Sequence, residues 1–217
     1  MRYLIVCGGK IDKEFGLNEI KTDGIDAIIA ADSGMDFLYE NGVTPDIIVG
    51  DFDSTTTNAL EYFERKGQTE IRRLNPIKDD TDTEYAIRLA ISEGARSIVV
   101  LGATGSRIDH VLGNISLLGI GLESGTDIRI IDTNNRIRMA DKPVTIEKSA
   151  QYGRFVSLIA LTDDNEVSLK GFKYPVTDYS FDRFTSLGIS NEIVDDQAVV
   201  DIHRGCLLYT SPSPRDA

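Results

Sequence analysis

Aspartate side chains follow several short apolar segments in the first half of the chain. Short continuous runs of β-branched residues are typical of parallel strands buried on both faces, and the carboxyl ends of such strands lie along one edge of a sheet. We therefore expect these carboxylates, which come from four separate loops, to meet in one crevice. They are Asp32, Asp51, Asp53, Asp82 and Asp109.

Carboxylates crowded at one sheet edge need a cation. Like charges at close range raise one another's pKa unless a positive charge joins them, and an oxygen-rich cluster suits Mg²⁺ together with substrate phosphates. In Asp51-Phe52-Asp53, the alternation of an extended segment would direct both carboxylates to one side and Phe52 into packing. For each single acid, the alternative is that it only solvates a loop. The shared pattern of four loops favours a magnesium site.

A glycine-containing loop, Gly102-Ala-Thr-Gly-Ser-Arg107, lies between a predicted strand and a predicted helix. Its glycines let backbone N–H groups approach phosphate oxygens, and the amino end of the following helix favours anions. The Arg107 guanidinium offers a fork of donors for a phosphate oxygen. The loop matches neither a Walker A motif nor a full dinucleotide fingerprint, so a tight turn with a surface arginine is the alternative. Beside the acids, the loop indicates nucleotide-dependent phosphoryl chemistry.

Other polar residues near these motifs have structural explanations. The segment Thr81-Asp-Thr-Glu84 fits a capping box, so we predict Thr81 as the helix N-cap and Glu84 reaching back to it. Asp82 is the residue of this segment that we expect to be functional. Cys7 lies in a predicted buried strand, which favours a small core residue over a nucleophile.

The elements that position these residues alternate between strand-like and helix-like segments. The predicted strands are 3–6, 25–31, 47–49, 71–74, 97–101 and 128–131. The predicted helices are 35–41, 57–66, 83–93 and 110–123, each with a glycine just beyond it that fits a helix C-cap. This series predicts an α/β fold with a doubly wound, mostly parallel sheet and helices on both faces.

The pattern changes after residue 135. Short alternating segments at 136–139, 144–147, 155–161, 167–169, 192–194 and 198–203 are separated by turn-like clusters, and helical periodicity is absent. These features predict a smaller antiparallel β-sandwich domain. We therefore predict an α/β catalytic domain over 1–135, a β domain over 136–209 and a disordered Ser/Pro-rich tail over 210–217.

Composition excludes several classes of function. The chain has 217 residues and a formal net charge of −12, which repels phosphodiester backbones and argues against nucleic-acid binding. A small anionic substrate is compatible with this charge because a metal ion can mediate the contact. No apolar run approaches the roughly 18 residues that span a bilayer. The two cysteines, Cys7 and Cys206, form neither a disulfide framework nor a zinc motif, so we expect a cytoplasmic protein.

Four motifs, in this order, resemble those of the thiamine pyrophosphokinase family. They are Ala31-Asp-Ser-Gly34, Pro45-Asp-Ile-Ile-Val-Gly-Asp-Phe-Asp-Ser54, Asp79-Asp-Thr-Asp-Thr-Glu84 and Gly102-Ala-Thr-Gly-Ser-Arg-Ile-Asp-His110. The resemblance extends through segments 171–175 and 186–192 and covers nearly the whole chain to residue 208. No motif is decisive alone, but the ordered set is specific.

This resemblance implies an ATP-dependent pyrophosphotransferase. Its members transfer the pyrophosphoryl group of ATP to the hydroxyl of thiamine, which gives thiamine diphosphate and AMP. The family architecture is an α/β catalytic domain followed by a β-sandwich, in a homodimer with thiamine near the subunit interface. A cationic thiazolium suits an acidic, aromatic-lined cleft, for which Tyr174 is a candidate stacking partner.

The resemblance also implies roles for individual residues. Asp51, Asp53 and Asp82 would hold Mg²⁺, with Asp32 as a further ligand or proton acceptor, and Arg107 would meet developing charge. Ser190 and Asn191, from the β domain, would contact thiamine. The residues expected to bind ATP are Gly102, Thr104, Gly105, Ser106, Arg107 and Asp109.

Two alternatives and one departure accompany this interpretation. Asp51-Phe-Asp-Ser-Thr55 also satisfies the D-x-D-x-T pattern of haloacid-dehalogenase-like phosphatases, in which Asp51 would be the nucleophile. A Mg-nucleotide sensor without turnover is the non-enzymatic alternative. The chain after Gly205 lacks the long apolar final strand expected of the family, so we expect a shortened closing strand.

Overall fold

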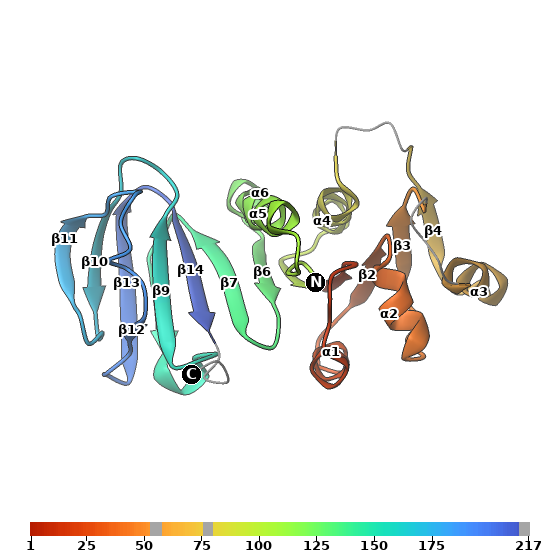
Figure 1. Ribbon diagram of the computed structural model, residues 1–217, viewed down its shortest axis with the longest axis horizontal. Coiled ribbons are helices and arrows are strands. Elements are labelled where there is room, and N and C mark those ends of the chain that lie inside the picture. Colours follow the sequence, from red (N-terminus) through yellow and green to blue (C-terminus); the bar gives the residue numbers. More distant parts are fainter. Residues whose placement is uncertain (53–57, 76–79, 213–217) are drawn as a thin grey trace. The chain divides into compact units, whose positions relative to one another are not determined.

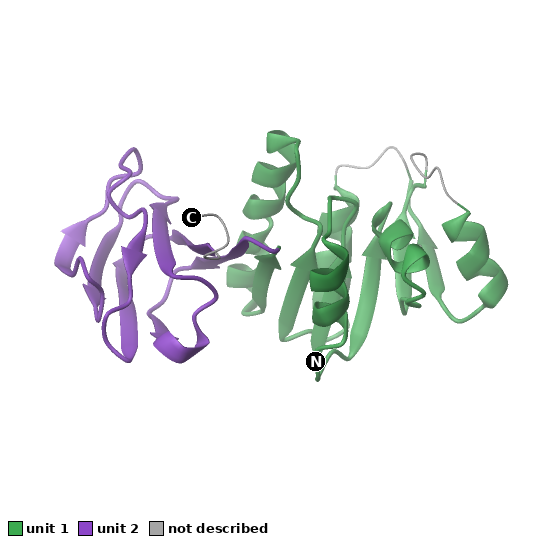
Figure 2. Ribbon diagram, turned by 60° about the horizontal axis from the view of Figure 1, so that its bottom comes forward, with its two compact units in different colours: residues 1–132 green, residues 133–217 purple. Residues whose placement is uncertain are grey.

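The computed structural model describes residues 1–52, 58–75 and 80–212. The chain divides into two compact units, residues 1–132 and residues 133–217 (Figure 2). The sequence-based boundary after Asn135 lies three residues beyond this division. Each unit has its own apolar core.

The first unit is built on a parallel sheet with the strand order β6-β5-β1-β2-β3-β4 (Figure 1). Every neighbouring pair in this order is parallel. Ile, Val, Leu and Ala dominate the inner strands because such residues can be buried on both faces. The strands are β1 (Arg2–Val6), β2 (Ala27–Ala31), β3 (Ile47–Gly50), β4 (Glu70–Arg73), β5 (Ser97–Leu101) and β6 (Asp127–Ile131).

Helices cover both faces of this sheet, as the sequence predicted. The strands β1 to β4 progress in one direction, whereas β5 and β6 lie on the other side of β1. Because strand–helix–strand crossovers are right-handed, this reversal places α1, α2 and α3 on one face and α4, α5 and α6 on the other (Figure 1). The helices are α1 (Lys13–Ile20), α2 (Gly34–Glu40), α3 (Ala59–Lys66), α4 (Asp82–Ser92), α5 (Ile108–Ser116) and α6 (Leu118–Ser124). None of the helices in the described part of the chain is long and apolar enough to cross a membrane.

The core of the first unit lies on both sides of the sheet. On one side, α2 and α3 bury Met35, Leu38 and Phe63 against inner strand residues such as Leu4 and Ile48. On the other side, α4 packs against β1, β2 and β3 and buries a stripe of small and branched residues. Apolar burial on this scale holds the strand ends in fixed positions and so fixes the loops that follow them.

The predicted strands of this unit are all present, but β4 differs in its environment. It lies at the edge of the sheet beside β3, and none of its residues is buried. The expectation that every strand is buried on both faces is therefore wrong for β4. Its sequence, Glu-Ile-Arg-Arg, carries the charged side chains typical of an exposed edge.

Two helical details also differ from the sequence-based prediction. Helix α1 was not predicted because its polar sequence contains Gly16, yet Asp12 caps it by accepting a hydrogen bond from Phe15 N at 2.9 Å. The single helix predicted over 110–123 is two helices that meet at Leu117. Helix α6 packs against β6, whereas α5 buries no residue.

The second unit is a β-sandwich, which confirms the predicted fold class. One sheet has the order β12-β9-β14-β7 and the other has the order β11-β10-β13-β8, and the strand pairs within them are antiparallel. Its strands are β7 (Asn135–Ala140), β8 (Val144–Glu147), β9 (Phe155–Ala160), β10 (Glu166–Lys170), β11 (Val176–Ser180), β12 (Asn191–Glu192), β13 (Gln197–Arg204) and β14 (Leu207–Pro212). A 3₁₀ turn, η1 (Lys148–Ala150), follows β8.

Alternate residues of the two sheets form the core of this unit. Val156 and Leu158 of β9 face the same core as Val167 of β10 and Val200 of β13. The residues that alternate with them, such as Ser157, Ser168 and Asp201, are polar, which fits the period-two pattern of a sandwich, although Ser157 and Ser168 are themselves buried. This pattern made most of the strands recognisable in the sequence. Strand β11 was not predicted, because four of its five residues are exposed.

The prediction of a tail from residue 210 is wrong for its first three residues. Thr210, Ser211 and Pro212 belong to β14, a six-residue strand that pairs with both β7 and β9. The closing strand is therefore not shortened. The Ser211 hydroxyl is fully buried, accepts from Gly153 N at 3.1 Å and donates to the Phe155 carbonyl at 3.2 Å. Polar composition suggested disorder, but strand pairing on both sides satisfies these groups. Residues 213–217 lie outside the described residues.

Two helical glycines should respond in opposite ways to alanine substitution. A Cβ at Gly121 of α6 would lie 2.6 Å from the Thr126 carbonyl oxygen, whereas a Cβ at Gly113 of α5 would meet nothing within 4 Å. We expect Gly121→Ala to lower the free energy of unfolding by about 1–3 kcal/mol through overpacking. We expect Gly113→Ala to raise it by up to about 1 kcal/mol. Urea unfolding followed by circular dichroism measures both, and equal effects would contradict the packing of α6 on β6.

Candidate functional site

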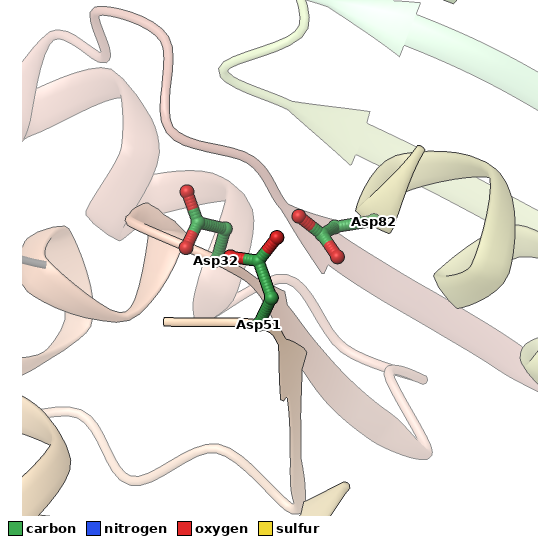
Figure 3. A group of neighbouring side chains, drawn as sticks. All are labelled: Asp32, Asp51 and Asp82. Atoms are coloured by element: carbon green, nitrogen blue, oxygen red, sulfur yellow. The ribbon is translucent and has the colours of Figure 1, made fainter. Parts of the chain in front are cut away.

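Three of the predicted acids meet at the carboxyl edge of the parallel sheet. Asp32 follows β2, Asp51 follows β3 and Asp82 begins α4. One carboxylate oxygen from each lies within 4.8 Å of the others, and Figure 3 shows the three side chains gathered at this place. All three are partly buried. Asp53, the fourth predicted metal ligand, lies outside the described residues.

The backbone turns sharply at Asp32 to bring its carboxylate into this group. Its N–H donates to the Val49 carbonyl at 2.8 Å, which extends the β2–β3 ladder by one residue. The residue itself has a φ of 47°, in the left-handed region that non-glycine residues seldom occupy. Helix α2 starts at once, and its first residue, Gly34, packs so closely on β1 that a Cβ would collide with the Val6 carbonyl oxygen.

Phe52 adopts a second left-handed conformation, with a φ of 64°. Its ring is 8% exposed and folds back over Gly50, where a Cβ would lie 3.0 Å from the Phe52 ring. The guanidinium of Arg73, from β4, lies 5.4 Å from the ring centroid, in a cation–π arrangement. The prediction that Phe52 packs inward is confirmed. The extended alternation expected for 51–53 is wrong, because the chain turns at Phe52 instead.

The start of α4 fixes Asp82. Thr81 is the N-cap, and its hydroxyl accepts from Glu84 N at 3.2 Å, as predicted. The prediction that Glu84 reaches back to the N-cap is wrong, because its carboxylate accepts two hydrogen bonds from Arg88, one turn further along the helix. Thr83 donates to Cys7 Sγ at 3.4 Å and so connects the first turn of α4 to the end of β1.

The three carboxylates form a donor set for a hard divalent cation. They come from three separate elements, so no single local turn explains their convergence. Hard cations such as Mg²⁺ prefer carboxylate oxygens and retain water in their remaining positions. The residues present therefore fit such an ion. The arrangement also leaves room in its coordination for substrate oxygens, because only one ligand atom from each residue is required.

The glycine-containing loop has a rigid half and an exposed half. Gly102 has a φ of 68° and is buried, and Thr104 donates to the Asp132 carboxylate at 2.7 Å. Gly105 and Ser106, by contrast, are exposed, and a Cβ at Gly105 would meet nothing within 4 Å. Asp132 was missed by sequence analysis, although it follows β6 in the same way that the other acids follow their strands.

Arg107 and Asp109 form an exposed ion pair in this loop. The guanidinium donates to both carboxylate oxygens, at 3.2 and 2.6 Å. The hydrogen bond from Arg107, aided by one from His110 N, lowers the pKa of Asp109 to about 2. An exposed pair of this kind adds little stability, so phosphate oxygens can replace the carboxylate at low cost.

The motif from the second unit consists of an exposed serine and a buried asparagine. Ser190 has a φ of 61°, and its N–H donates to the Ser157 hydroxyl at 3.0 Å. The Asn191 amide oxygen accepts from Tyr174 N at 3.1 Å, and its amide nitrogen donates to the Tyr174 carbonyl at 3.0 Å. Asn191 thus holds the main chain of Tyr174, whose side chain is 62% exposed.

Glu192 joins two cations beside this motif. Its carboxylate accepts from Lys173 at 2.7 Å and from Arg154 at 3.0 Å. The hydrogen bond from Lys173, followed by that from Arg154, lowers the pKa of Glu192. The contact with Lys173 fixes the chain immediately before Tyr174, whose side chain is exposed.

Comparison with known proteins gives a consistent result for both units. A family model described as "Thiamin pyrophosphokinase, catalytic domain" matches residues 21–130. A second, described as "Thiamin pyrophosphokinase, vitamin B1 binding domain", matches residues 143–207.

Individual relatives agree with these matches. Thiamine pyrophosphokinase of Bacillus subtilis (strain 168) is 34% identical over 182 residues, which is 83% of this chain and 84% of the relative. A crystal structure of thiamine pyrophosphokinase from Bacillus subtilis superposes with a TM-score of 0.88 at 31% identity, over 99% of this chain and 100% of the other. The corresponding structure from Geobacillus thermodenitrificans gives a TM-score of 0.86 at 29% identity, over 99% of each chain.

The two cysteines should differ in reactivity, since Cys7 is buried and Cys206 is partly exposed. Burial raises the pKa of the Cys7 thiol to about 11, despite the hydrogen bond from Thr83. At about pH 8, we expect Cys206→Ser to resist the thiol reagent DTNB until it is unfolded, and Cys7→Ser to react while folded. Rapid labelling of Cys7 in the folded Cys206→Ser variant would contradict its assignment as a core residue.

Proposed function

Because the chain belongs to the thiamin pyrophosphokinase family, we propose that it transfers the pyrophosphoryl group of ATP to the hydroxyl of thiamine with Mg²⁺ held by its acid cluster. The observation that carries this proposal is the convergence of Asp32, Asp51 and Asp82 within 4.8 Å at the carboxyl edge of the sheet. Open α/β sheets bind their ligands at this edge. Both family domains are present in the order that the activity requires.

The reaction is a displacement at the β-phosphorus of ATP. The thiamine hydroxyl oxygen forms a bond to this phosphorus, the bond between the β-phosphorus and the α–β bridging oxygen breaks, and AMP leaves. The hydroxyl proton passes to a base. The enzyme gains rate mainly by holding the alcohol in line and stabilising charge on the transferring oxygens.

The acid cluster serves the nucleotide side of this reaction. Asp32, Asp51 and Asp82, together with Asp53, are the proposed Mg²⁺ ligands. When bound, the ion offsets phosphate charge and orients the phosphate oxygens. The backbone of Gly102, Thr104, Gly105 and Ser106 offers N–H donors to the phosphates. Arg107 exchanges its Asp109 partner for a phosphate oxygen, supported by the exposure of that pair.

Thiamine binding is assigned to the second unit, with Ser190 as a direct contact. The hydrogen bonds of Asn191 support a different role from the one its motif suggested, because both ends of its amide hold Tyr174. We therefore propose that Asn191 positions Tyr174, and that the Tyr174 ring stacks on cationic thiamine. The proposed enzyme is a homodimer with thiamine near the subunit interface.

Two further features belong to this proposal. Reaction in the cytoplasm is supported by the unpaired state of Cys7 and Cys206. A phosphatase in which Asp51 is the nucleophile has less support, because Asp51 follows the third strand of the sheet and the whole-length relatives are pyrophosphokinases. Product analysis distinguishes the proposed pyrophosphokinase from a nucleotide sensor, because a sensor forms no product.

Product analysis is therefore the first experiment. We expect incubation of the protein with ATP, Mg²⁺ and thiamine to yield AMP and thiamine diphosphate in equal amounts, because only β-phosphorus attack gives this pair. Anion-exchange chromatography quantifies both. Formation of ADP and thiamine monophosphate would identify a simple kinase instead. Nucleotide binding without any thiamine-dependent product would identify a sensor.

The acid cluster can be tested separately from turnover. Asp51→Asn and Asp82→Asn should each weaken Mn²⁺ binding by at least about tenfold, because each removes a charged ligand. Turnover should fall by about 100-fold or more. Asp23→Asn is the matched control, since Asp23 is exposed in the loop between α1 and β2. Electron paramagnetic resonance measures Mn²⁺ binding directly, and wild-type affinity in both cluster variants would refute the metal assignment.

A further inference from the structure

The end of β1 occupies the central position of the nucleotide edge. In the strand order β6-β5-β1-β2-β3-β4, the chain leaves β1 toward β2 on one side and returns to β5 on the other. The loops after β1 and β5 therefore diverge at this point, which is where open α/β sheets form their ligand crevice. The loop after β5 carries the glycine-containing segment. The loop after β1, Cys7-Gly-Gly-Lys-Ile-Asp12, has no role in the proposed function so far.

Backbone contacts fasten the β1 loop to the β5 loop. Cys7 N donates to the Leu101 carbonyl at 2.8 Å, and Gly9 N donates to the Gly102 carbonyl at 2.9 Å. A Cβ at Gly9 would collide with the Gly102 carbonyl oxygen and would lie 2.6 Å from the Thr104 carbonyl oxygen. The two loops are thus in direct main-chain contact over this stretch.

The same loop also touches the turn that carries Asp32. A Cβ at Gly8 would collide with the hydroxyl oxygen of Ser33, the residue after Asp32. The β1 loop therefore lies between the acid cluster on one side and the glycine-containing loop on the other. The approach of two carbonyl oxygens explains why position 9 is glycine, and the contacts of both residues fix where the next residue emerges.

Lys10 is that next residue, and it is exposed. Its neighbour Ile11 turns inward, where the side chain lies against Gly102 and Gly16. Among the described residues, Lys10 forms no hydrogen bond or ion pair through its side chain. Its ammonium group is therefore available at the divergence of the β1 and β5 loops.

Two other cations in the described part of this edge already have anionic partners. Arg107 pairs with Asp109, and Arg73, at the end of β4, pairs with Glu64 at 2.5 Å. A nucleotide triphosphate brings several negative charges to an edge that already holds three carboxylates. Binding therefore requires positive charge besides a metal ion, and a lysine beside a glycine-containing loop supplies it as a mobile point charge.

We propose that Lys10 binds a phosphate oxygen of the nucleotide and is a binding residue of the active site. This inference rests on the proposed function only in taking ATP as the ligand of this edge. The loop after β1 then becomes the third wall of the nucleotide site, beside the acid cluster and the 102–109 loop. The Gly8-Gly9 pair positions Lys10, because it brings the main chain close to both the turn at Asp32 and the 102–109 loop.

Three variants test this role. Lys10→Ala removes the charge, Lys10→Arg retains it, and Lys21→Ala removes an equal charge at the far end of α1, where Lys21 is the C-cap. Binding of α,β-methylene-ATP, which cannot be cleaved at the reacting bond, is measured by calorimetry with Mg²⁺ present. Adenosine, which has no phosphates, is the ligand control. Thermal unfolding verifies that the variants fold equally well.

We expect Lys10→Ala to weaken binding of α,β-methylene-ATP by about tenfold and to leave adenosine binding unchanged. Lys10→Arg should recover most of the loss, and Lys21→Ala should bind as the wild type does. In turnover, the KM for ATP should rise in Lys10→Ala while the KM for thiamine stays constant.

The outcomes separate this inference from the proposed function. If Lys10→Ala binds the analogue as tightly as Lys21→Ala does, the role of Lys10 is refuted, even where the wild type forms thiamine diphosphate. If the wild type forms no thiamine diphosphate but Lys10→Ala still weakens analogue binding, the proposed function fails and the role of Lys10 stands. If the wild type binds no nucleotide, both are refuted.

Discussion

The register of the parallel ladder between β2 and β3 decides where the acids of this protein meet. Ala31 lies opposite Val49, and the next rung is the hydrogen bond from Asp32 N to the Val49 carbonyl. This rung holds Asp32 beside Gly50 and the start of the Asp51 loop. A slip of one residue would send one of the carboxylates to the opposite face, because side chains alternate along a strand. Helix α4 completes the group because it packs across β1, β2 and β3 and so brings Asp82 to the same edge.

The chain adopts unusual backbone conformations in the turns that follow β2 and β3. Asp32 and Phe52 have positive φ values of 47° and 64°, and such conformations cost about 1–3 kcal/mol each in non-glycine residues. The surrounding packing maintains them. The Phe52 ring is buried over Gly50, and Gly34 lets α2 start in contact with β1. Small residues at Gly34 and Gly50 thus make room for a strained turn that aims two carboxylates at one point.

The loops of the second unit are held in place in a different way from those of the first. Its loops are held by buried polar side chains that hydrogen-bond to the main chain. Asn191 holds Tyr174, and Asn165, which is 2% exposed, accepts from Thr162 Oγ1 at 2.7 Å and from Cys206 N at 3.1 Å. Short loops of a β-sandwich contain many backbone groups that have no partner in a neighbouring strand. Amide side chains, which both donate and accept, form hydrogen bonds with these groups instead. A motif residue such as Asn191 can therefore be essential for a site without touching its ligand.

Local sequence pattern was enough to predict the class of the fold and the convergence of three acids at one sheet edge. Short β-branched runs, each followed by acids, are enough to predict a parallel sheet with carboxylates at one edge, since that edge collects every strand end. Local pattern could not reveal the environment of β4, the helix at Lys13–Ile20, the pairing of Thr210–Pro212 or the turn at Phe52. Each of these depends on contacts between residues distant in the chain. They are the pairing of β4 with β3, the approach of Phe37 to Gly16, the two partners of β14, and the Arg73 guanidinium over the Phe52 ring. The hydrogen-bond partners of Asn191 and of Gly9 also lie 17 to more than 90 residues away in the chain. Only tertiary contacts therefore place the Asn191 side chain and the main chain before Lys10.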